Sequence, residues 1–312
     1  MIVPAGKSAP TIGLVGVGNW GRHILHDLKC LGATVHAVAR SPHSIDIAKA
    51  GGAASVGPDA TLLPRCDGYV VASTVTSHLD VIDALLPRGR PIFVEKPLSN
   101  DVNRVRALPA EAHRLVFVMH KWRYHPGVEA LAQIAASREF GPVTGIATTR
   151  VGFGVNHEDV DPVWVLAPHD LSILLHILGE LPEAISGYAD PGALRPGDGV
   201  LWRLRGLGGI PAQIEISSGR VAQRRSIALF CRDAIVELND GNYDRLALRR
   251  RDDPPTGEPR YRAVPVKLPL FAELEAFLAH VAGGPPPMSS LAEEIAILAR
   301  IVDLRRMAGI AD

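Results

Sequence analysis

The amino-acid sequence predicts an α/β chain in which a parallel sheet comes first and an α+β domain with an open, mostly antiparallel sheet follows. Three observations predict this class. Strand and helix signals alternate through the first third of the chain, the strands there are uniformly apolar, and the later strands are longer and alternate in polarity. Uniformly apolar strands between helices are typical of parallel sheets covered on both faces, whereas alternating strands are typical of antiparallel sheets.

The first third of the chain contains the elements of the parallel sheet in regular order. We expect helices at 19–31, 45–50, 77–86 and 101–108, and strands at 11–17, 34–39, 53–56, 68–72, 91–94 and 115–119. The alternation stops near Trp122. This change of pattern divides the chain into a first domain at 1–122 and a second at 123–312.

The remaining residues predict the second sheet and its helices. Helices are expected at 125–136 and 170–178, and strands at 143–151, 212–217, 225–231, 234–238 and 245–250. Gly179 ends the second of these helices, and the charged residues, prolines and glycines at 249–262 predict an exposed hairpin or loop. Two helices finish the chain, and Ser290 with Glu293 forms a capping box before the last.

Composition excludes several classes of function. The 312 residues contain 33 Lys plus Arg and 33 Asp plus Glu, so the formal charge cancels, which argues against a nucleic-acid or acidic-membrane partner. The three cysteines, Cys30, Cys66 and Cys231, form no CxxC pair, which favours buried thiols in a reducing compartment. No signal peptide, membrane span or metal-ligand spacing is recognised, so we expect a cytoplasmic protein without a metal.

A glycine-rich loop follows the first strand and opens the first helix. Residues 16–21 read Gly-Val-Gly-Asn-Trp-Gly, the GxGxxG pattern of a dinucleotide-binding Rossmann sheet. The first glycine permits a tight turn, the second lets the backbone approach a pyrophosphate, and the third lets helix and strand pack closely. The helix N-terminus then offers N–H groups to the phosphates. The residues expected to contact the cofactor here are Gly16, Gly18, Asn19, Trp20, Gly21 and Arg22.

The end of the second strand predicts which dinucleotide binds. An NAD site places an acidic residue about 20 positions after the last glycine, where it accepts a hydrogen bond from the adenine ribose. This chain has Arg40 and Ser41 there. A guanidinium pairs with a 2′-phosphate and a serine hydroxyl donates to it, so we expect NADP. The alternative is that Arg40 stacks on the adenine and discriminates little, in which case NAD is used as well.

Five further segments complete a pattern. They are 73–78 (Ser-Thr-Val-Thr-Ser-His), 94–97 (Val-Glu-Lys-Pro), 119–126 (Met-His-Lys-Trp-Arg-Tyr-His-Pro), 140–143 (Phe-Gly-Pro-Val) and 164–172 (Trp-Val-Leu-Ala-Pro-His-Asp-Leu-Ser). In this order and spacing, with the glycine loop, they resemble the Gfo/Idh/MocA oxidoreductases, the glucose–fructose oxidoreductase and inositol dehydrogenase family. The resemblance covers nearly the whole chain, and the last segment is similar to members that act on nucleotide sugars.

The resemblance implies a Rossmann domain, a substrate domain with an open sheet, and a homodimer or homotetramer. It implies that Lys96 contacts both the cofactor ribose and the substrate, and that His169 is the general acid/base. Independently of the family, a Lys at the carboxyl end of a parallel strand lies where ligands bind, and its ammonium can stabilise an alkoxide. The further cofactor contacts expected are Ser73, Thr74, His78, Glu95 and Lys96.

The sequence departs from the family pattern near His169. Many members carry an Asp four residues before this His and a second one three residues after it, where this chain has Val165 and Ser172. Two explanations stay open: a nearby carboxylate replaces the missing one, or Lys96 or Tyr124 is the acid/base. The carboxylates considered are Asp159, Asp161 and Asp170. The substrate contacts expected are Lys96, Arg123, Tyr124, Trp164 and His169, with packing as the alternative for Arg123, Tyr124 and Trp164.

These observations predict an NADP-dependent oxidoreductase that moves a hydride between the nicotinamide and a carbinol or ketone carbon of a sugar or nucleotide sugar. Two alternatives stay open. One is a reductase of another small carbonyl compound or an imine. The other is a dinucleotide-binding sensor that has lost its chemistry, which Val165 favours and which Lys96 and His169 oppose.

Overall fold

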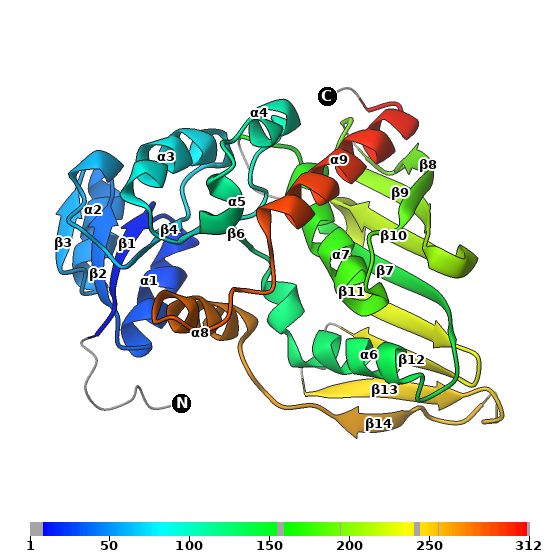
Figure 1. Ribbon diagram of the computed structural model, residues 1–312. Coiled ribbons are helices and arrows are strands. Elements are labelled where there is room, and N and C mark those ends of the chain that lie inside the picture. The colour runs from blue at the N-terminus through cyan, green and yellow to red at the C-terminus, as the bar shows by residue number, and fades with distance from the viewer. Residues whose placement is uncertain (1–8, 155–158, 194, 240–243, 255, 311–312) are drawn as a thin grey trace. The chain divides into compact units, whose positions relative to one another are not determined.

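The computed structural model describes residues 9–154, 159–193, 195–239, 244–254 and 256–310. The chain divides into two compact units (Figure 1). The first contains residues 1–120 and 270–295, and the second contains residues 121–269 and 296–312. Residues 270–295 therefore group with the first unit, whereas the sequence-based division kept 123–312 together.

The first unit is built on a parallel sheet of six strands in the order β3-β2-β1-β4-β5-β6. Every recorded pairing in it is parallel, as the uniformly apolar strands predicted. The strands are β1(Thr11–Val15), β2(Thr34–Val38), β3(Ser55–Gly57), β4(Gly68–Val71), β5(Ile92–Glu95) and β6(Val116–Met119). The order changes direction between β1 and β4, which is the switch point where parallel sheets of this kind bind ligands.

Helices flank this sheet. They are α1(Gly21–Cys30), α2(Pro42–Ala50), α3(His78–Leu85), α4(Val102–Arg106), α5(Ala112–Leu115) and α8(Pro269–Val281), with the 3₁₀ turns η1(Ala60–Leu62), η2(Val75–Ser77) and η3(Leu86–Arg88). One core cluster joins side chains of β1, β2, α1 and α8. Within it, Phe277 of α8 stacks on Phe93 of β5 with ring centroids 5.0 Å apart. This stacking explains why a helix from the end of the chain belongs to the first unit.

The second unit contains an eight-stranded sheet in the order β14-β13-β12-β11-β7-β10-β9-β8. Its pairings are antiparallel except for the parallel pair β10–β7. The strands are β7(Val143–Phe153), β8(Glu183–Ala189), β9(Gly199–Arg205), β10(Pro211–Ser217), β11(Gly219–Cys231), β12(Ala234–Asn239), β13(Arg245–Arg250) and β14(Arg260–Ala263). The prediction of an open, mostly antiparallel sheet is confirmed.

Two helices contact this sheet, and a third runs from one unit into the other. The first two, α6(Pro126–Ser137) and α7(Pro162–Leu178), contact each other, and α7 also contacts β7, β9 and β10. The third, α9(Leu291–Met307), begins after the predicted capping box: Ser290 donates its N–H to Glu293 at 2.8 Å, and Glu293 donates its own to the Ser290 hydroxyl at 3.2 Å.

Some element predictions were wrong. Strands β8 and β9 were not expected. The hairpin expected at 249–262 is confirmed, because β13 and β14 pair antiparallel at its two ends. Helix α7 begins at Pro162 rather than at 170, although Gly179 ends it with φ 76° as predicted. An interior Pro168 disfavours a helix by about 3 kcal/mol, but Asp161 caps the helix start and burial of most of its side chains outweighs that cost.

The cysteines and the helix lengths complete the description. Cys66 and Cys231 are buried as expected, whereas Cys30 is exposed, and all three thiols are free. Over the described ranges, no helix has both the length and the apolar character needed to cross a membrane. The same ranges hold no group of three or more His, Cys, Asp or Glu side chains placed to hold a metal ion.

Candidate cofactor and substrate sites

The three glycines of the 16–21 loop have the geometry of a dinucleotide-binding turn. Gly16 has φ 95°, and a Cβ there would lie 2.6 Å from the Ala72 carbonyl oxygen. A Cβ on Gly21 would lie 2.1 Å from the Gly16 carbonyl oxygen, so α1 begins in direct contact with the turn. A Cβ on Gly18 would meet no described atom within 4 Å. The loop is therefore tight at both ends and open at Gly18, which fits a pyrophosphate against the α1 N-terminus.

The other predicted residues of this loop lie at its surface. Asn19, Trp20 and Arg22 are exposed. The Trp20 indole N–H donates to a carboxylate oxygen of Glu95, which ends β5 and is itself buried. The other Glu95 oxygen accepts the Lys96 backbone N–H at 3.1 Å. Glu95 thus links the glycine loop to the turn that carries Lys96, whose side chain is half-buried.

His78 links two more loops at the same edge of the sheet. Its imidazole is buried, with Nδ1 at 3.1 Å from the Pro97 carbonyl oxygen and Nε2 at 3.1 Å from that of Ser73. Burial lowers the pKa of His78. These contacts make His78 a positioning residue for the loops after β4 and β5, rather than a side chain presented to a cofactor.

Ser73 and Thr74 lie in the loop after β4 and are bonded within it. The Ser77 hydroxyl donates to the Ser73 hydroxyl at 2.7 Å, and the Thr74 hydroxyl lies 3.3 Å from that of Ser77. Ser73 is half-buried and Thr74 is exposed. Their hydroxyls therefore lie at the surface of the edge that the glycine loop and Lys96 share.

Arg40 and Ser41 follow β2 as the sequence predicted. The Arg40 side chain is 75% exposed, with Nε donating to the Pro58 carbonyl at 3.3 Å and a terminal nitrogen 3.9 Å from Asp59. An exposed ion pair of this length contributes little free energy, so the guanidinium can turn toward a ligand. The Ser41 hydroxyl caps α2 by accepting the Ser44 backbone N–H at 3.1 Å.

A buried carboxylate, which the sequence analysis missed, supports the Lys96 turn from behind. Glu294 of α9 accepts the Leu98 backbone N–H at 3.2 Å, and its second oxygen lies 2.8 Å from Nε2 of His120. All three residues belong to the first unit. No sequence signal pointed to Glu294, because its partners are more than 170 residues away along the chain.

The segment 121–125 opens the second unit as a 3₁₀ turn, η4(Lys121–Tyr124), followed by the cap of α6. Arg123 is buried and Tyr124 is half-buried. His125 stacks on Trp122 with centroids 5.1 Å apart, and its Nδ1 accepts the Gly127 N–H at 3.0 Å. Burial lowers the pKa of His125 to about 4, so its imidazole is neutral near pH 7.

Helix α7 carries His169 in a buried position, one turn after the buried Val165. The next residue, Asp170, accepts two hydrogen bonds from Arg150 of β7, at 3.0 and 3.3 Å. This bidentate pair is buried on both sides. Asp170 therefore neutralises Arg150 and links α7 to the sheet.

An aspartate and an arginine also hold the start of α7 in place. Asp161 accepts the Trp164 backbone N–H at 3.1 Å and an Arg305 N–H at 2.7 Å, and the Arg305 guanidinium lies over the Trp164 ring at 5.3 Å. Trp164 is 5% exposed. Asp161 thus both caps α7 and pairs with Arg305. Trp164 lies in the surroundings of a core residue, which fits the alternative that it packs rather than contacts a substrate. Asp159 is half-buried.

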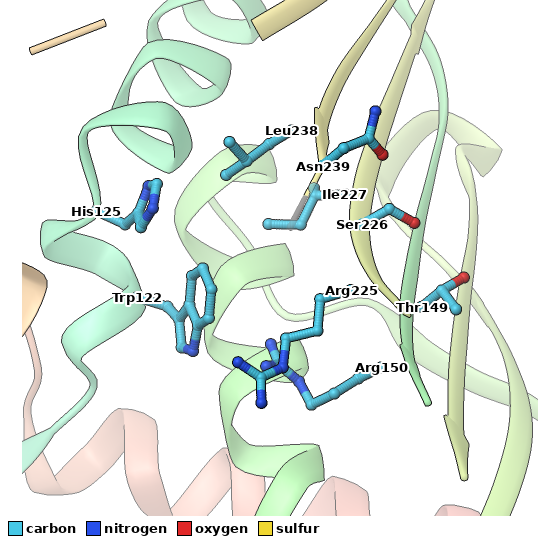
Figure 2. Close-up of a pocket in the computed structure, with 9 residues that line it drawn as sticks. All are labelled: Trp122, His125, Thr149, Arg150, Arg225, Ser226, Ile227, Leu238 and Asn239. Atoms are coloured by element: carbon cyan, nitrogen blue, oxygen red, sulfur yellow. The ribbon is translucent and has the colours of Figure 1, made fainter. Parts of the chain in front are cut away.

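The structure brings the predicted residues together in two groups. The glycine loop, Arg40, Ser73, His78 and the Lys96 turn lie at the carboxyl edge of the parallel sheet in the first unit, and Tyr124 and His169 lie in the second. The residues that sequence reasoning missed are Arg150, Trp122, His125, Glu294 and His120. Of these, Trp122, His125 and His120 lie in the 119–126 segment already singled out. Figure 2 shows Arg150, Trp122 and His125, which line a small pocket of the second unit.

Known proteins resemble this chain over both halves. The model of an oxidoreductase family with an NAD-binding Rossmann fold, GFO_IDH_MocA, matches residues 11–120. A myo-inositol dehydrogenase, Hyg17 of Streptomyces leeuwenhoekii, is 32% identical over 143 residues. This match spans 43% of this chain and 43% of the relative, less than half of either. A UDP-N-acetylglucosamine 3-dehydrogenase of Acidithiobacillus ferrooxidans is 24% identical over 236 residues, or 72% of this chain and 73% of that protein.

Solved structures share the fold over nearly the whole chain. The UDP-N-acetylglucosamine 3-dehydrogenase GnnA of Acidithiobacillus ferrooxidans has a TM-score of 0.81 at 20% identity, covering 96% of this chain and 98% of its own. A levoglucosan dehydrogenase in complex with NADH and levoglucosan has a TM-score of 0.84 at 14% identity, covering 97% and 98%. At such identities the likeness shows the fold alone.

Two substitutions in the glycine loop test cofactor binding separately from stability. We expect Gly18→Ala to leave the free energy of unfolding within about 0.5 kcal/mol but to weaken NADPH binding about tenfold, because the methyl group occupies the open space at the loop. Gly21→Ala is the control, and overpacking against Gly16 should cost about 1–3 kcal/mol of stability. Urea unfolding and NADPH fluorescence titration measure the two effects. Wild-type NADPH affinity in Gly18→Ala would contradict this reading.

The lowered pKa of His125 predicts how the free energy of unfolding depends on pH. Its folded pKa, about 4, lies below the roughly 6.5 of an unfolded chain, so on acidification the unfolded chain takes up the proton first. The stabilisation from His125 is therefore complete above about pH 6.5 and is lost as pH falls toward about 4. His125→Asn keeps a capping side chain and should reduce the stability lost between pH 7 and 5 by about 1–2 kcal/mol.

Urea unfolding at both pH values measures this change. The control is His43→Asn on the exposed face of α2, which should leave the pH dependence of the free energy of unfolding as in the wild type. An unchanged pH dependence in His125→Asn would show that His125 is not buried in its neutral form.

Proposed function

We propose that the chain, whose residues 11–120 match the model of the Gfo/Idh/MocA oxidoreductase family with its NAD-binding Rossmann fold, is an NADP-dependent oxidoreductase of that family. It moves a hydride between the nicotinamide and a carbinol or ketone carbon of a sugar or nucleotide sugar. The observation that carries the proposal is the carboxyl edge of the parallel sheet. There, a loop open only at Gly18 and the turn bearing Lys96 are joined through Trp20 and Glu95.

The residues of this edge fit a bound dinucleotide. Helix α1 begins at Gly21, three residues after the open position at Gly18, and a helix N-terminus at this place can bind a pyrophosphate. Ser73 and Thr74 present hydroxyls at the same edge. When bound, the nicotinamide supplies or accepts the hydride.

Lys96 and His169 are the proposed catalytic residues. The Lys96 ammonium stabilises negative charge on the substrate oxygen as the carbonyl and alkoxide interconvert. His169 donates or accepts the proton at that oxygen, since an imidazole titrates near neutral pH; Tyr124 is the other candidate for this proton. Because Asp161 and Asp170 are bound to Arg305 and Arg150, the proton transfer does not use either carboxylate.

NADP is proposed over NAD because of the residues that follow β2. Arg40 is the first side chain beyond the strand with the reach and charge to pair with a 2′-phosphate, and its exposed contact with Asp59 is weak. Ser41 adds a hydroxyl, although that group also caps α2. An acidic residue at this position would repel the same phosphate.

A sugar or nucleotide-sugar substrate is proposed from the relatives. The two curated relatives act, by their names, on myo-inositol and on UDP-N-acetylglucosamine. We also propose that the chain forms a homodimer or homotetramer through the face of the second sheet that α6 and α7 do not cover. Buried and less buried residues alternate along β9 and β10, which supports an open second face.

Cofactor choice is tested by titrating NADPH and NADH separately. Wild type should bind NADPH at least tenfold more tightly than NADH. Arg40→Gln should weaken NADPH binding about tenfold and leave NADH binding unchanged, because a charge-assisted hydrogen bond to the 2′-phosphate is lost. Arg106→Gln, exposed on α4, is the control and should change neither affinity. Equal wild-type affinities for the two cofactors would overturn the NADP assignment.

Turnover is tested with myo-inositol, UDP-N-acetylglucosamine and levoglucosan in the presence of NADP⁺ or NAD⁺. At least one should be oxidised, and Lys96→Met should lower kcat by about 100-fold or more while the cofactor dissociation constant changes less than about tenfold. Lys49→Met, exposed on α2, is the matched control. Tight NADPH binding without turnover of any substrate would reject the enzyme and favour a sensor.

A further inference from the structure

The turn that carries Lys96 is hydrogen-bonded to a fully buried carboxylate at the start of α9. The Leu98 backbone N–H, two residues after Lys96, donates to Oε1 of Glu294 at 3.2 Å. The Leu98 and Glu294 side chains are both 0% exposed. A buried carboxylate is costly unless hydrogen bonds compensate for the lost water, so the partners of Glu294 determine whether it can stay behind this turn.

His120 is the second partner of Glu294. Its Nε2 lies 2.8 Å from Oε2 of Glu294, and its imidazole is 1% exposed. Nδ1 of His120 is buried and has no hydrogen-bond partner among the described residues. A proton on Nδ1 would therefore be buried without an acceptor, whereas a proton on Nε2 is bonded to the carboxylate. His120 thus donates to Glu294 and fixes the direction of its carboxylate.

The ladder between β5 and β6 places His120 beside the Lys96 turn. The last recorded pair of this ladder is Glu95 with Met119. Lys96 and His120 are the next residues on the two strands, at the carboxyl edge of the sheet. Ser289, just before α9, donates its hydroxyl to a backbone carbonyl of β6. The start of α9 is therefore bonded to the carboxyl ends of both strands.

Glu294 completes the hydrogen bonds of the backbone that follows Lys96. Nδ1 of His78 lies 3.1 Å from the Pro97 carbonyl oxygen and 3.3 Å from that of Leu98. The Leu98 N–H is bonded to Glu294 instead. Without that carboxylate, this buried N–H would lose its acceptor, which costs enough free energy to favour a shift of the turn. The position of the turn therefore depends on Glu294.

We propose that Glu294, oriented by His120, is a positioning residue that holds the Lys96 ammonium at the substrate oxygen. The inference rests on the proposed function for the role of Lys96. Reacting groups must be held within about 0.5 Å of the productive geometry, and a misplacement of about 1 Å can lower a rate about 100-fold. Because Glu294 acts through the backbone of the turn, its loss should lower kcat more than it weakens NADPH binding.

Substitutions of Glu294 test this role in turnover. With the substrate and cofactor that the turnover panel identifies, Glu294→Ala should lower kcat about tenfold or more and change the NADPH dissociation constant less than about threefold. Glu294→Gln should restore kcat to within about threefold of wild type, because its amide oxygen still accepts the Leu98 N–H. Equal kcat values in the Ala and Gln variants would overturn the proposal.

Two further variants guard against loss of folding. If Glu294→Ala does not fold, Glu294→Asp replaces it, and the side chain shortened by one methylene should lower kcat about threefold or more. Tyr69→Phe is the matched control. It removes a hydroxyl on a buried side chain that accepts the Cys66 N–H at 3.4 Å near the amino end of β4, so it should lower stability without lowering kcat. Far-ultraviolet circular dichroism and thermal unfolding check each variant.

The reactivity of Lys96 tests the proposal without turnover. Brief reaction with acetic anhydride, followed by mass spectrometry, measures the acetylation rate of Lys96 relative to that of Lys49, which is exposed on α2. Release of the half-buried Lys96 should raise this ratio about threefold or more in Glu294→Ala, and Tyr69→Phe should leave it unchanged. An unchanged ratio in folded Glu294→Ala would overturn the proposal.

The two readouts separate this inference from the proposed function. A raised Lys96 ratio in Glu294→Ala, with no turnover of any substrate by wild type, would reject the proposed function and keep the support of the Lys96 turn by Glu294. Wild-type turnover that depends on Lys96, with an unchanged ratio in Glu294→Ala, would keep the function and reject the role of Glu294.

Discussion

The close approach of Gly21 to the Gly16 carbonyl constrains the whole edge of the first sheet. No side chain fits between the turn and the first residue of α1, so the N-terminus of the helix stays against the turn that follows β1. Gly16 is in turn pressed against the Ala72 carbonyl, which ties the glycine loop to the loop after β4. A dinucleotide site of this kind therefore follows from the absence of two side chains.

Two polar side chains extend that constraint to Lys96. His78 bonds the carbonyls of Ser73 and Pro97, and Glu95 accepts from both Trp20 and the Lys96 backbone. Buried hydrogen-bonded groups of this sort hold loops in a single arrangement, because leaving one partner unsatisfied costs about 1–3 kcal/mol. The turn bearing the proposed catalytic cation is thereby fixed from several sides before any ligand binds.

In the second unit, one buried and one partly buried ion pair hold helix α7 in place. Arg150–Asp170 is buried and secures the middle of α7, and removing one partner of a buried pair typically costs about 3–5 kcal/mol. Arg305–Asp161 is partly buried and secures the start of the helix. The same bonds occupy the carboxylates that were candidates to replace the one missing at Val165. In the proposed function, His169 and Tyr124 are therefore the candidates for proton transfer.

The sequence by itself determined the class of each sheet, the glycine loop and most strands of the first unit, because these depend on local periodicity and on glycines at fixed spacing. It also located Arg40, Lys96 and the 164–172 segment. Only the tertiary structure decided that residues 270–295 join the first unit, that α7 runs through Pro168, and that Asp161 and Asp170 are bound elsewhere. The tertiary structure alone showed that Glu294 contacts His120 and that Arg225 lies opposite Arg150 in neighbouring strands. These features depend on contacts between residues distant in the chain, and no local pattern encodes which buried charge will meet which partner.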